Sequence, residues 1–528
     1  MTLVPGADFA KTLSSAFAQP TSTRLGQQLA VQAERHPGQS GFGLLPRGVD
    51  GLLLRTQLVR AAERSIDIQY YVFAEDDTGK LLQEAILRAA DRGVRVRLLI
   101  DDTNSFGPSS SGTDMPPLWQ PAMPEILAAL GDHKNIELRM FNPFVYRGSF
   151  LVFRYIDFAF NAPRVNHRMH NKLLVVDNAL AVVGGRNVAD EYFDAGAPPV
   201  RFGDFDVAAT GPVVPQLSAS FDDYWNSALS IPQKALAPVA LASTSLPDAR
   251  ADLATHRAAI DASEIERGVN RGDPLKGLLD GRLPWIWAPA TVIADAPEKA
   301  ELAPGEKVHS PVVRALMRSM DEASDEVDIV TPYFVPGDRG LTLLERLRDR
   351  RVRVRILTNS LASTDVPAVH GAYRKYRRPL VEAGVELSEI RAVPGQALEE
   401  AGTHGTGSGS GSDAPFALHA KIYVFDQKRV FIGSANFDRR SFHLNTELGL
   451  MIDSPELARQ IIVRFDQFAA LPNSYQLVLD PAGPLGPRLR WLTQVDGKSV
   501  ELDDDPDASS TRRLLAAFFS VLPIDELL

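Results

Sequence analysis

The sequence predicts an α/β protein in which one unit occurs twice, forming a bilobal monomer with pseudo-twofold symmetry. The first observation is a polar motif, His-x-Lys, four residues, Asp, found at His170, Lys172 and Asp177 and again at His419, Lys421 and Asp426. The copies lie 249 residues apart (419 − 170). The second observation is that similar helix and strand patterns precede each copy. Because chance rarely repeats such spacing, we expect one active site at the interface of the units.

Hydrophobic periodicity predicts the elements of the first unit within residues 58–100. An amphipathic helix is expected to end at Arg64, and residues 66–73 are expected to form a strand. A second helix should pass through 87–90, and a second strand should follow at 94–99. This order of helix, strand, helix and strand is typical of an α/β unit.

The second unit repeats this order from Val313 onward. The matching elements are a strand at 327–330, a helix at 341–350 and a strand at 352–357. A further pair of matching strands is expected at 136–140 and 385–389. In both units the motif precedes a continuous apolar run, at 173–176 and 422–425, which predicts a buried strand. Each motif should therefore stand on a rigid strand near the end of its unit.

The residue types in the motif suit attack on a phosphorus atom. A neutral imidazole is a nucleophile and a protonated one is an acid near neutral pH, so two facing histidines can act on both sides of a phosphodiester. Alternate residues of a strand point to the same side, so Lys172 should project with His170, and Lys421 with His419. Lysines and amides can together surround phosphate oxygens. The amides belong to Gly-containing turns that follow each Asp after six intervening residues and end at Asn187 and Asn436.

The full motif, His-x-Lys-(x)4-Asp-(x)6-Gly-(Gly/Ser)-x-Asn, resembles the signature of the phospholipase D superfamily at both copies. The resemblance implies two α-β-α sandwich units, metal-independent catalysis and a phosphohistidine intermediate. It makes His170 the expected nucleophile and His419 the expected acid and base. Lys172, Asp177, Lys421 and Asp426 are the other expected catalytic residues. In this family an acidic residue on the strand after the motif orients the histidine. Glu447 fits this role for the second copy and Asp204 for the first, while Ser434 and the two asparagines are expected to bind phosphate or orient these groups.

The sequence predicts neither a metal site nor a cofactor. Cysteine is absent, which excludes a thiolate metal site, and the remaining histidines show no zinc-ligand spacing. Seven of them are interpreted as surface or satisfied polar residues: His36, His133, His256, His309, His370, His404 and His443. His167 differs because it leads directly into the first motif. It is expected either to line the mouth of the pocket or to be one more polar residue.

A chain of 528 residues is too long for one core and suits two domains. The predicted organisation is an N-terminal helical extension (1–42), unit one (43–212), a connector (213–306), unit two (307–470) and a C-terminal tail packing on the core or the membrane (471–528). The connector is rich in Ala, Pro and Ser and looks as if it wraps the two units. The Gly/Ser-rich stretch 402–412 indicates a flexible loop that either gates the site or has no function.

Charge and hydropathy narrow the class of partner. The net charge of −10 argues against a protein devoted to nucleic-acid backbones, which usually needs a basic face. Residues 1–20 lack the apolar core of a signal peptide, and no run of eighteen apolar residues occurs, so any membrane contact should be peripheral. Two segments are candidates for such contact or for core packing, the aromatic and basic stretch 141–160 and the tail 512–519. The cationic stretch 373–378 suits an anionic headgroup, a nucleic-acid backbone or a solvated helix face.

Flanking sequences narrow the substrate. Residues 36–42, 68–71, 92–96, 166–171 and 522–525 resemble the bacterial cardiolipin synthases of the C type. The resemblance implies a phosphatidyltransferase that forms cardiolipin from phosphatidylglycerol and a second phospholipid, either phosphatidylglycerol or phosphatidylethanolamine. Such a protein would be peripheral to the bacterial inner membrane and otherwise cytoplasmic. The alternatives are a phospholipase D releasing phosphatidic acid, a phospholipase D-like nuclease and a non-catalytic membrane-binding protein.

Overall fold

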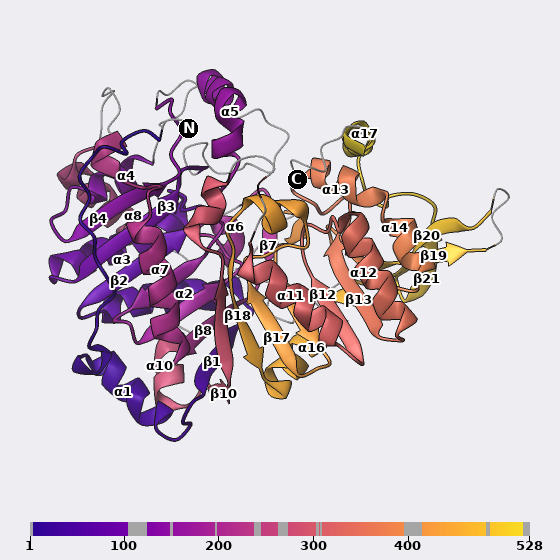
Figure 1. Ribbon diagram of the computed structural model, residues 1–528, viewed down its shortest axis with the longest axis horizontal. Helices are drawn as coiled ribbons and strands as arrows, with labels where there is room; N and C mark the ends of the chain where they lie inside the picture. The colour runs from indigo at the N-terminus through magenta and orange to yellow at the C-terminus, as the bar shows by residue number, and fades with distance from the viewer. Residues whose placement is uncertain are drawn as a thin grey trace.

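Two large mixed sheets lie side by side, each with helices packed against it (Figure 1). The computed structural model describes residues 4–103, 124–147, 151–195, 198–236, 244–261, 273–302, 306, 309–394, 414–481 and 486–520. The predicted 402–412 loop and the 522–525 segment lie outside these residues. The α/β fold class with two matching halves is confirmed.

The first sheet has the strand order β10-β1-β8-β6-β5-β2-β3-β4-β9. Its three parallel strands are β2 (Ser65–Tyr70), β3 (Arg95–Asp101) and β4 (Ile136–Phe141). The antiparallel strands are β1 (Ser40–Leu45), β5 (Leu173–Val176), β6 (Leu180–Gly184), β8 (Asp206–Thr210), β9 (Ser230–Pro232) and β10 (Ile286–Ala288). The run 173–176 is buried throughout because both faces of the sheet are covered, which explains its continuous apolar sequence.

The second sheet has the order β11-β18-β17-β16-β12-β13-β14-β19-β20-β21. Its parallel strands are β12 (Glu326–Val330), β13 (Arg353–Asn359) and β14 (Glu386–Ile390). The antiparallel strands are β11 (Ala290–Ala294), β16 (Ile422–Phe425), β17 (Arg429–Gly433), β18 (Leu448–Asp453), β19 (Ser474–Asp480), β20 (Arg488–Val495) and β21 (Lys498–Leu502). Strands β12, β13, β14, β16, β17 and β18 repeat the pairing of β2, β3, β4, β5, β6 and β8.

Helices cover the sheets and connect their strands. In the first half they are α1 (Arg24–Ala33), α2 (Gly48–Ala61), α3 (Asp77–Asp91), α4 (Glu125–Leu130), α5 (Leu151–Val165), α6 (Asp190–Phe193), α7 (Val213–Asn226), α8 (Leu246–Asp261) and α10 (Pro274–Asp280). In the second half they are α11 (Pro311–Glu322), α12 (Gly337–Asp349), α13 (Pro367–Arg374), α14 (Arg377–Glu382), α16 (Pro455–Ala469) and α17 (Ser510–Ser520). Short 3-10 turns cover Pro20–Ser22, Gln233–Leu236 and Pro297–Glu301, and a π-helical turn covers Arg440–Leu444.

One hydrophobic core is shared by the two halves. It contains buried side chains from both sheets, among them Leu173 and Val175 of β5 and Ile422 and Val424 of β16, together with residues of α7 and α16. Burial of apolar surface is the main favourable term in association, so this shared core holds the two halves in a fixed relation. A small sheet of β7 (Arg201–Gly203) and β15 (Phe416–Leu418) also crosses between them.

The segments expected to be a connector (213–306) and a tail (471–528) contribute strands to the two large sheets. Helix α7 from the connector packs in the shared core, while β10 joins the first sheet and β11 joins the second. Strands β19, β20 and β21 from the expected tail extend the second sheet at its edge. Residues of both segments therefore pair within the two sheets, and those of α7 are buried in the shared core.

Candidate active site

His170 lies just before β5, and its backbone is held by the second half. The amide of His170 donates to the carbonyl of Thr446 at 2.9 Å, and the amide of Thr446 donates to the carbonyl of Arg168 at 2.9 Å. Thr446 precedes β18 of the second sheet. The backbone that presents the first histidine is therefore fixed across the interface.

His419 follows β15, and the first half holds its backbone in turn. Strand β15 pairs in parallel with β7, and the amide of His419 donates to the carbonyl of Gly203 at 2.8 Å. A Cβ at Gly203 would lie only 2.3 Å from the ring of Phe416, so this crossing requires glycine. Each histidine is thus positioned by the half that does not contain it.

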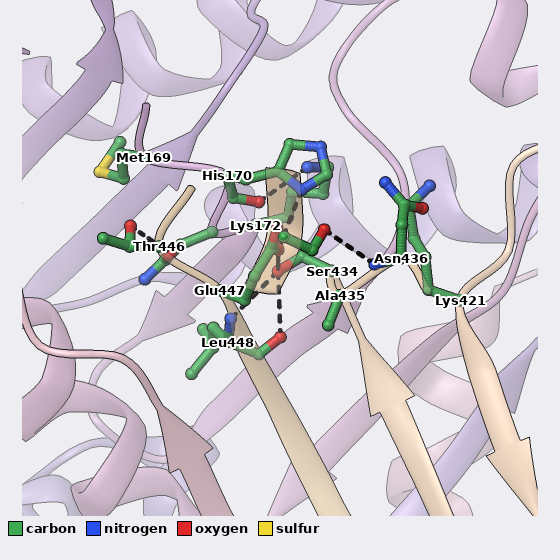
Figure 2. Close-up of polar contacts among 12 residues, drawn as sticks. Met169, His170, Lys172, Lys421, Ser434, Ala435, Asn436, Thr446, Glu447 and Leu448 are labelled. Atoms are coloured by element: carbon green, nitrogen blue, oxygen red, sulfur yellow. Dashed lines mark hydrogen bonds and ion pairs between the residues drawn. The ribbon is translucent and has the colours of Figure 1, made fainter. Parts of the chain in front are cut away.

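The orienting carboxylates also cross the interface, which corrects the expectation that each acid serves its own copy. Nδ1 of His170 donates to the Glu447 carboxylate at 2.9 Å, and Nδ1 of His419 donates to the Asp204 carboxylate at 2.6 Å. Figure 2 shows His170 above Glu447. Because a carboxylate only accepts, it fixes the proton on Nδ1 and leaves Nε2 with its lone pair.

The two carboxylates are supported differently, which breaks the pseudo-symmetry. The hydroxyl of Ser434 donates to Glu447 and accepts from the amide of Leu448 at 3.0 Å (Figure 2). The equivalent turn of the first motif has Gly185, where a Cβ would lie 2.3 Å from the Asp204 carboxylate. The shorter Asp204 side chain therefore approaches the turn itself, whereas Glu447 is held through a hydroxyl.

The two lysines take up different positions beside their histidines. Nζ of Lys172 donates to the carbonyl of His170 at 2.8 Å and lies 5.5 Å from the ring centre of Tyr71. Nζ of Lys421 donates to the carbonyl of His419 and lies 3.1 Å from Nε2 of that ring. Nζ of Lys421 also lies 2.8 Å from Nδ1 of that ring, so Lys421 contacts both the imidazole and the backbone of its histidine, whereas Lys172 contacts the backbone of its own.

Aromatic rings that the sequence reasoning did not single out as site residues pack against both histidines. Tyr71 packs edge-on against His170, with ring centres 5.1 Å apart, and Tyr192 packs edge-on against His419 at 5.0 Å. Phe202 of β7 also lies 5.1 Å from the His419 ring. The available signal for Tyr71 was its place directly after β2, since side chains gather at the ends of parallel strands.

The asparagines of the two turns lie at the site in unequal environments. The amide of Asn187 donates to the Tyr192 hydroxyl at 2.9 Å, and its carbonyl accepts from the amide of Val72 at 3.3 Å. The side-chain oxygen of Asn436 is buried and accepts no hydrogen bond within the described residues. Asn436 is thus a polar group still available to a ligand.

Asp177 and Asp426 do not belong to the reacting group of side chains, so the expectation of a catalytic role is corrected. The Asp177 carboxylate accepts from the amides of residues 63–65 at 2.7–3.0 Å, and that of Asp426 accepts from the amides of residues 324–326 at 2.8–3.1 Å. Each lies beyond the end of its four-residue strand, away from the histidine. They fix the loops that lead into β2 and β12.

Burial keeps both histidines neutral near pH 7. Burial and the ammonium of Lys172 lower the pKa of His170 to about 4 despite the opposing effect of Glu447. Burial and Lys421 lower the pKa of His419 to about 3 despite Asp204. Lys421 also lowers the pKa of His170, and Lys172 that of His419, so the two motifs act on each other within one site.

The lysines are buried cations close to one another. Burial and the neighbouring Lys421 lower the pKa of Lys172 to about 7. Burial lowers the pKa of Lys421 to about 8, although Asp204 and Glu447 oppose it. An anion bound beside these two lysines would favour both protonated forms, because opposite charge raises the pKa of an ammonium group.

His167 lies in the interface between the halves. Its side chain is 7% exposed, and its Nδ1 lies 3.1 Å from the carbonyl of Leu444. Burial lowers the pKa of His167. Beside it, Arg440 donates to the backbone and side-chain oxygens of Asn166 at 2.8 Å. These contacts join the segment before the first motif to the second half.

A buried ion pair from the expected connector supports Glu447. The amide of Glu447 donates to the Asp295 carboxylate at 3.2 Å, and the amide of Asp295 donates to the carbonyl of Glu447 at 2.9 Å. Lys299 neutralises Asp295 at 2.7 Å. Sequence reasoning missed this pair, because neither residue lies near a motif in the chain.

No group of three or more His, Cys, Asp or Glu side chains within the described ranges is placed to hold a metal ion. The groups that gather at the site are instead two imidazoles, the two carboxylates that orient them, two ammonium groups and amides. Such a set can attack a phosphorus atom, donate a proton and neutralise phosphate oxygens.

Known proteins that are similar in sequence to this chain are consistent with this chemistry. A family model described as "Cardiolipin synthase, PLD-like domain" matches residues 56–197 and 316–469. The chain is 37% identical over 517 residues to cardiolipin synthase C of Escherichia coli, covering 96% of this chain and 100% of that protein. It is 28% identical over 403 residues to cardiolipin synthase A of Pseudomonas fluorescens, covering 76% of this chain and 63% of that protein.

Among solved structures, a phosphatidylserine synthase of Haemophilus influenzae is similar, with a TM-score of 0.52 and 13% identity. The match covers 85% of this chain and 92% of that one. At this identity the likeness concerns the fold, which is the same arrangement of two phospholipase D-like units. The two segments that match the family model, 56–197 and 316–469, each carry one His-x-Lys motif. The protein belongs to the family of cardiolipin synthases with phospholipase D-like domains.

Proposed function

We propose that this protein is a phosphatidyltransferase that forms cardiolipin. The observation that carries the proposal is the pair of histidines held by crossed carboxylates in one buried site of a chain from this family. Phospholipids are the substrates that the names of the related synthases imply. Phosphatidylglycerol is the proposed acceptor, and a second phosphatidylglycerol or a phosphatidylethanolamine is the proposed donor.

In the first step Nε2 of His170 attacks the phosphorus of the donor lipid. A P–N bond forms, the bond from phosphorus to the headgroup oxygen breaks, and the leaving alkoxide takes a proton from Nε2 of His419. His419 is neutral in the unliganded site, so the bound phosphodiester anion must raise the pKa of His419 before this transfer.

In the second step a glycerol hydroxyl of phosphatidylglycerol attacks the phosphohistidine. His419 removes the proton from that hydroxyl, the P–N bond breaks, and His170 is regenerated with cardiolipin as the product. Water is the competing nucleophile, and its attack would release phosphatidic acid instead.

The asymmetry of the lysines supports the proposed roles. Nζ of Lys421 lies 2.8 Å from Nδ1 and 3.1 Å from Nε2 of His419, so a proton donor stands beside this imidazole, which suits an acid and base. No such contact is present at Nε2 of His170 within the described residues, and this suits a nucleophile. Lys172, Lys421 and the side-chain amide nitrogen of Asn436 are the proposed donors to the phosphate oxygens, whose negative charge they would stabilise in the transition state.

The proposal is tested with purified protein and vesicles of phosphatidylglycerol, with and without phosphatidylethanolamine, by mass spectrometry of the lipid products. Cardiolipin should form with the parent protein and fall by roughly 10²-fold or more in His170→Ala and His419→Ala. His309→Ala, an exposed histidine outside the site, is the matched control and should keep full activity. Phosphatidic acid as the sole product would contradict synthesis, and cleavage of single-stranded DNA without any lipid product would overturn the lipid assignment.

A further inference from the structure

Helix α5 exposes apolar side chains to solvent and buries charged ones, which is the reverse of an ordinary surface helix. Its buried side carries two charged residues beside Val165: Asp157 is 7% exposed and accepts from the amide of Tyr146 at 2.8 Å, and Arg164 is 7% exposed. Its outer side is apolar, with Val152, Phe153, Tyr155, Ile156, Phe158 and Phe160 all exposed, Phe160 by 83%. A contiguous apolar face of this kind indicates a partner that excludes water.

A second apolar face stands on α17. Leu514 is 72% exposed, Phe518 is 55% exposed, and Leu515 lies beside them at 40%. Helix α17 nonetheless packs closely against α13. A Cβ at Gly371 of α13 would lie only 2.7 Å from the carbonyl oxygen of Ala516. Helix α17 is therefore a docked element of the fold that leaves several large apolar side chains exposed.

Both helices are attached to the edge of the sheets where the histidines lie. Helix α5 ends at Val165, and His170 follows five residues later. Arg512 of α17 donates to the carbonyls of Leu361 and Thr364, which follow β13. The last residue of β13, Asn359, donates to the carbonyl of Leu418, next to His419. Figure 1 shows α5 and α17 on the same upper side of the molecule, one on each half.

We propose that α5 and α17 form a two-point docking surface that seats the protein on a lipid bilayer with the interface of the halves between them. The apolar faces would enter the boundary between headgroups and acyl chains. This inference rests on the proposed function, because the bilayer would be the source of both lipid substrates. A bilayer is the occupant that fits, since it can cover two separate apolar faces on different halves at once.

Local charge supports a bilayer that contains anionic lipids. The chain carries a net charge of −10, yet the end of α13 beneath α17 places Arg374 and Lys375 at the surface, with Arg374 3.7 Å from the Asp504 carboxylate. Cations beside an exposed apolar helix are the combination that binds anionic headgroups. Within the described residues no helix is long and apolar enough to cross the membrane.

The test compares variants of the full chain that remove apolar side chains already exposed to solvent. Ile156→Ser with Phe160→Ser alters α5, Leu514→Ser with Phe518→Ser alters α17, and a four-fold variant combines them. The matched controls are Val31→Ser on α1 and Val463→Ser on α16, which are 56% and 57% exposed. Circular dichroism and thermal unfolding verify that every variant is folded.

Two readouts separate docking from chemistry. Sedimentation with vesicles of phosphatidylglycerol and phosphatidylcholine should show each double variant bound more weakly and the four-fold variant bound at least about tenfold more weakly, with the controls unchanged. Turnover of dihexanoyl phosphatidylglycerol below its micelle concentration should stay within about twofold for all variants, because monomeric lipid needs no docking. Turnover of vesicle lipid should fall in parallel with binding.

Specific outcomes overturn the inference. Vesicle binding of the four-fold variant equal to that of the parent protein would show that these helices do not dock. If the four-fold variant instead loses a dimer seen by analytical ultracentrifugation while vesicle binding persists, the faces bind a second copy of the chain. If the parent protein binds vesicles through these helices but forms no lipid product, docking stands and the proposed function fails.

Discussion

Glu447 and Asp204 define the site at the scale of single residues. Each carboxylate accepts a hydrogen bond from Nδ1 of the histidine of the opposite motif. The carboxylate therefore lies 277 positions from His170 in one case and 215 positions from His419 in the other. The carboxylate fixes the tautomer in which Nε2 is free to react. The chemistry of each motif is therefore completed only by the other half of the chain.

The crossed pairing predicts which histidine each acid controls. Glu447→Gln should lower kcat roughly 10²- to 10⁴-fold, because an amide in place of the carboxylate no longer fixes the proton on Nδ1 of His170. Ser434→Ala, which removes only one hydrogen bond to that carboxylate, should have a smaller effect. Both variants are compared with the parent protein by steady-state turnover. They are also compared by the amount of phosphohistidine trapped from an activated phosphodiester with a good leaving group. Undiminished trapping at His170 in Glu447→Gln would contradict the assignment.

The buried charges predict the pH dependence of kcat/KM, which reports groups of the free enzyme. His170, with a pKa of about 4, is unprotonated above that pH, so the nucleophile is lost only as the pH falls through about 4. Lys172, with a pKa of about 7, carries its charge below that pH and loses it above. Activity should therefore decline on the alkaline side from about pH 7. Lys172→Arg should move this decline to higher pH while lowering the maximum, and an unmoved alkaline limb would contradict the role of Lys172.

At the scale of elements, the Asp of each motif works as a backbone anchor. Asp177 lies at the end of β5 with a positive φ of 52°, and its carboxylate accepts the amides that lead into β2. Asp426 repeats this at the end of β16 with a φ of 51°. The motif therefore combines a reacting histidine at one end of a strand with a structural carboxylate at the other end.

This anchoring predicts a loss of stability without a specific loss of chemistry. Asp177→Gly keeps the positive φ and removes the carboxylate, so it should lower the free energy of unfolding by about 1–3 kcal/mol through unpaired backbone amides. Asp177→Asn retains one acceptor oxygen and a residue type that tolerates this φ, so its cost should be smaller. Chemical denaturation measures both changes. Per folded molecule, both variants should keep kcat within about threefold, and loss of kcat as large as in His170→Ala would contradict the structural role.

At the scale of the whole molecule, the two halves act as one enzyme. A hydrophobic core shared by both sheets and the β7–β15 pairing hold them together, and each half fixes the histidine of the other. One chain therefore supplies both imidazoles, both carboxylates and both lysines. An internal pseudo-dimer of this kind needs no second chain to complete its site.

The single-chain site predicts the result of a mixing experiment. Equal amounts of His170→Ala and His419→Ala protein, mixed or expressed together, should regain no activity, because no chain in the mixture holds both histidines. Cardiolipin formation by the mixture is compared with that of each variant alone. Recovery toward a quarter or more of the parent activity, roughly the statistical share of an exchanged site, would show that halves of different chains combine.

The sequence by itself determined the duplicated α/β units, because hydrophobic periodicity and motif spacing are local properties that survive without knowledge of contacts. The duplicated motif also pointed to the histidines and lysines that lie together at the site, but it grouped Asp177 and Asp426 with them. Only the tertiary structure decided that Glu447 serves His170 and Asp204 serves His419, that Asp177 and Asp426 anchor backbone, and that Tyr71, Tyr192 and the Asp295–Lys299 pair support the site. These facts depend on how the two halves pack across a shared core, and spacing along one chain carries no information about which half faces which.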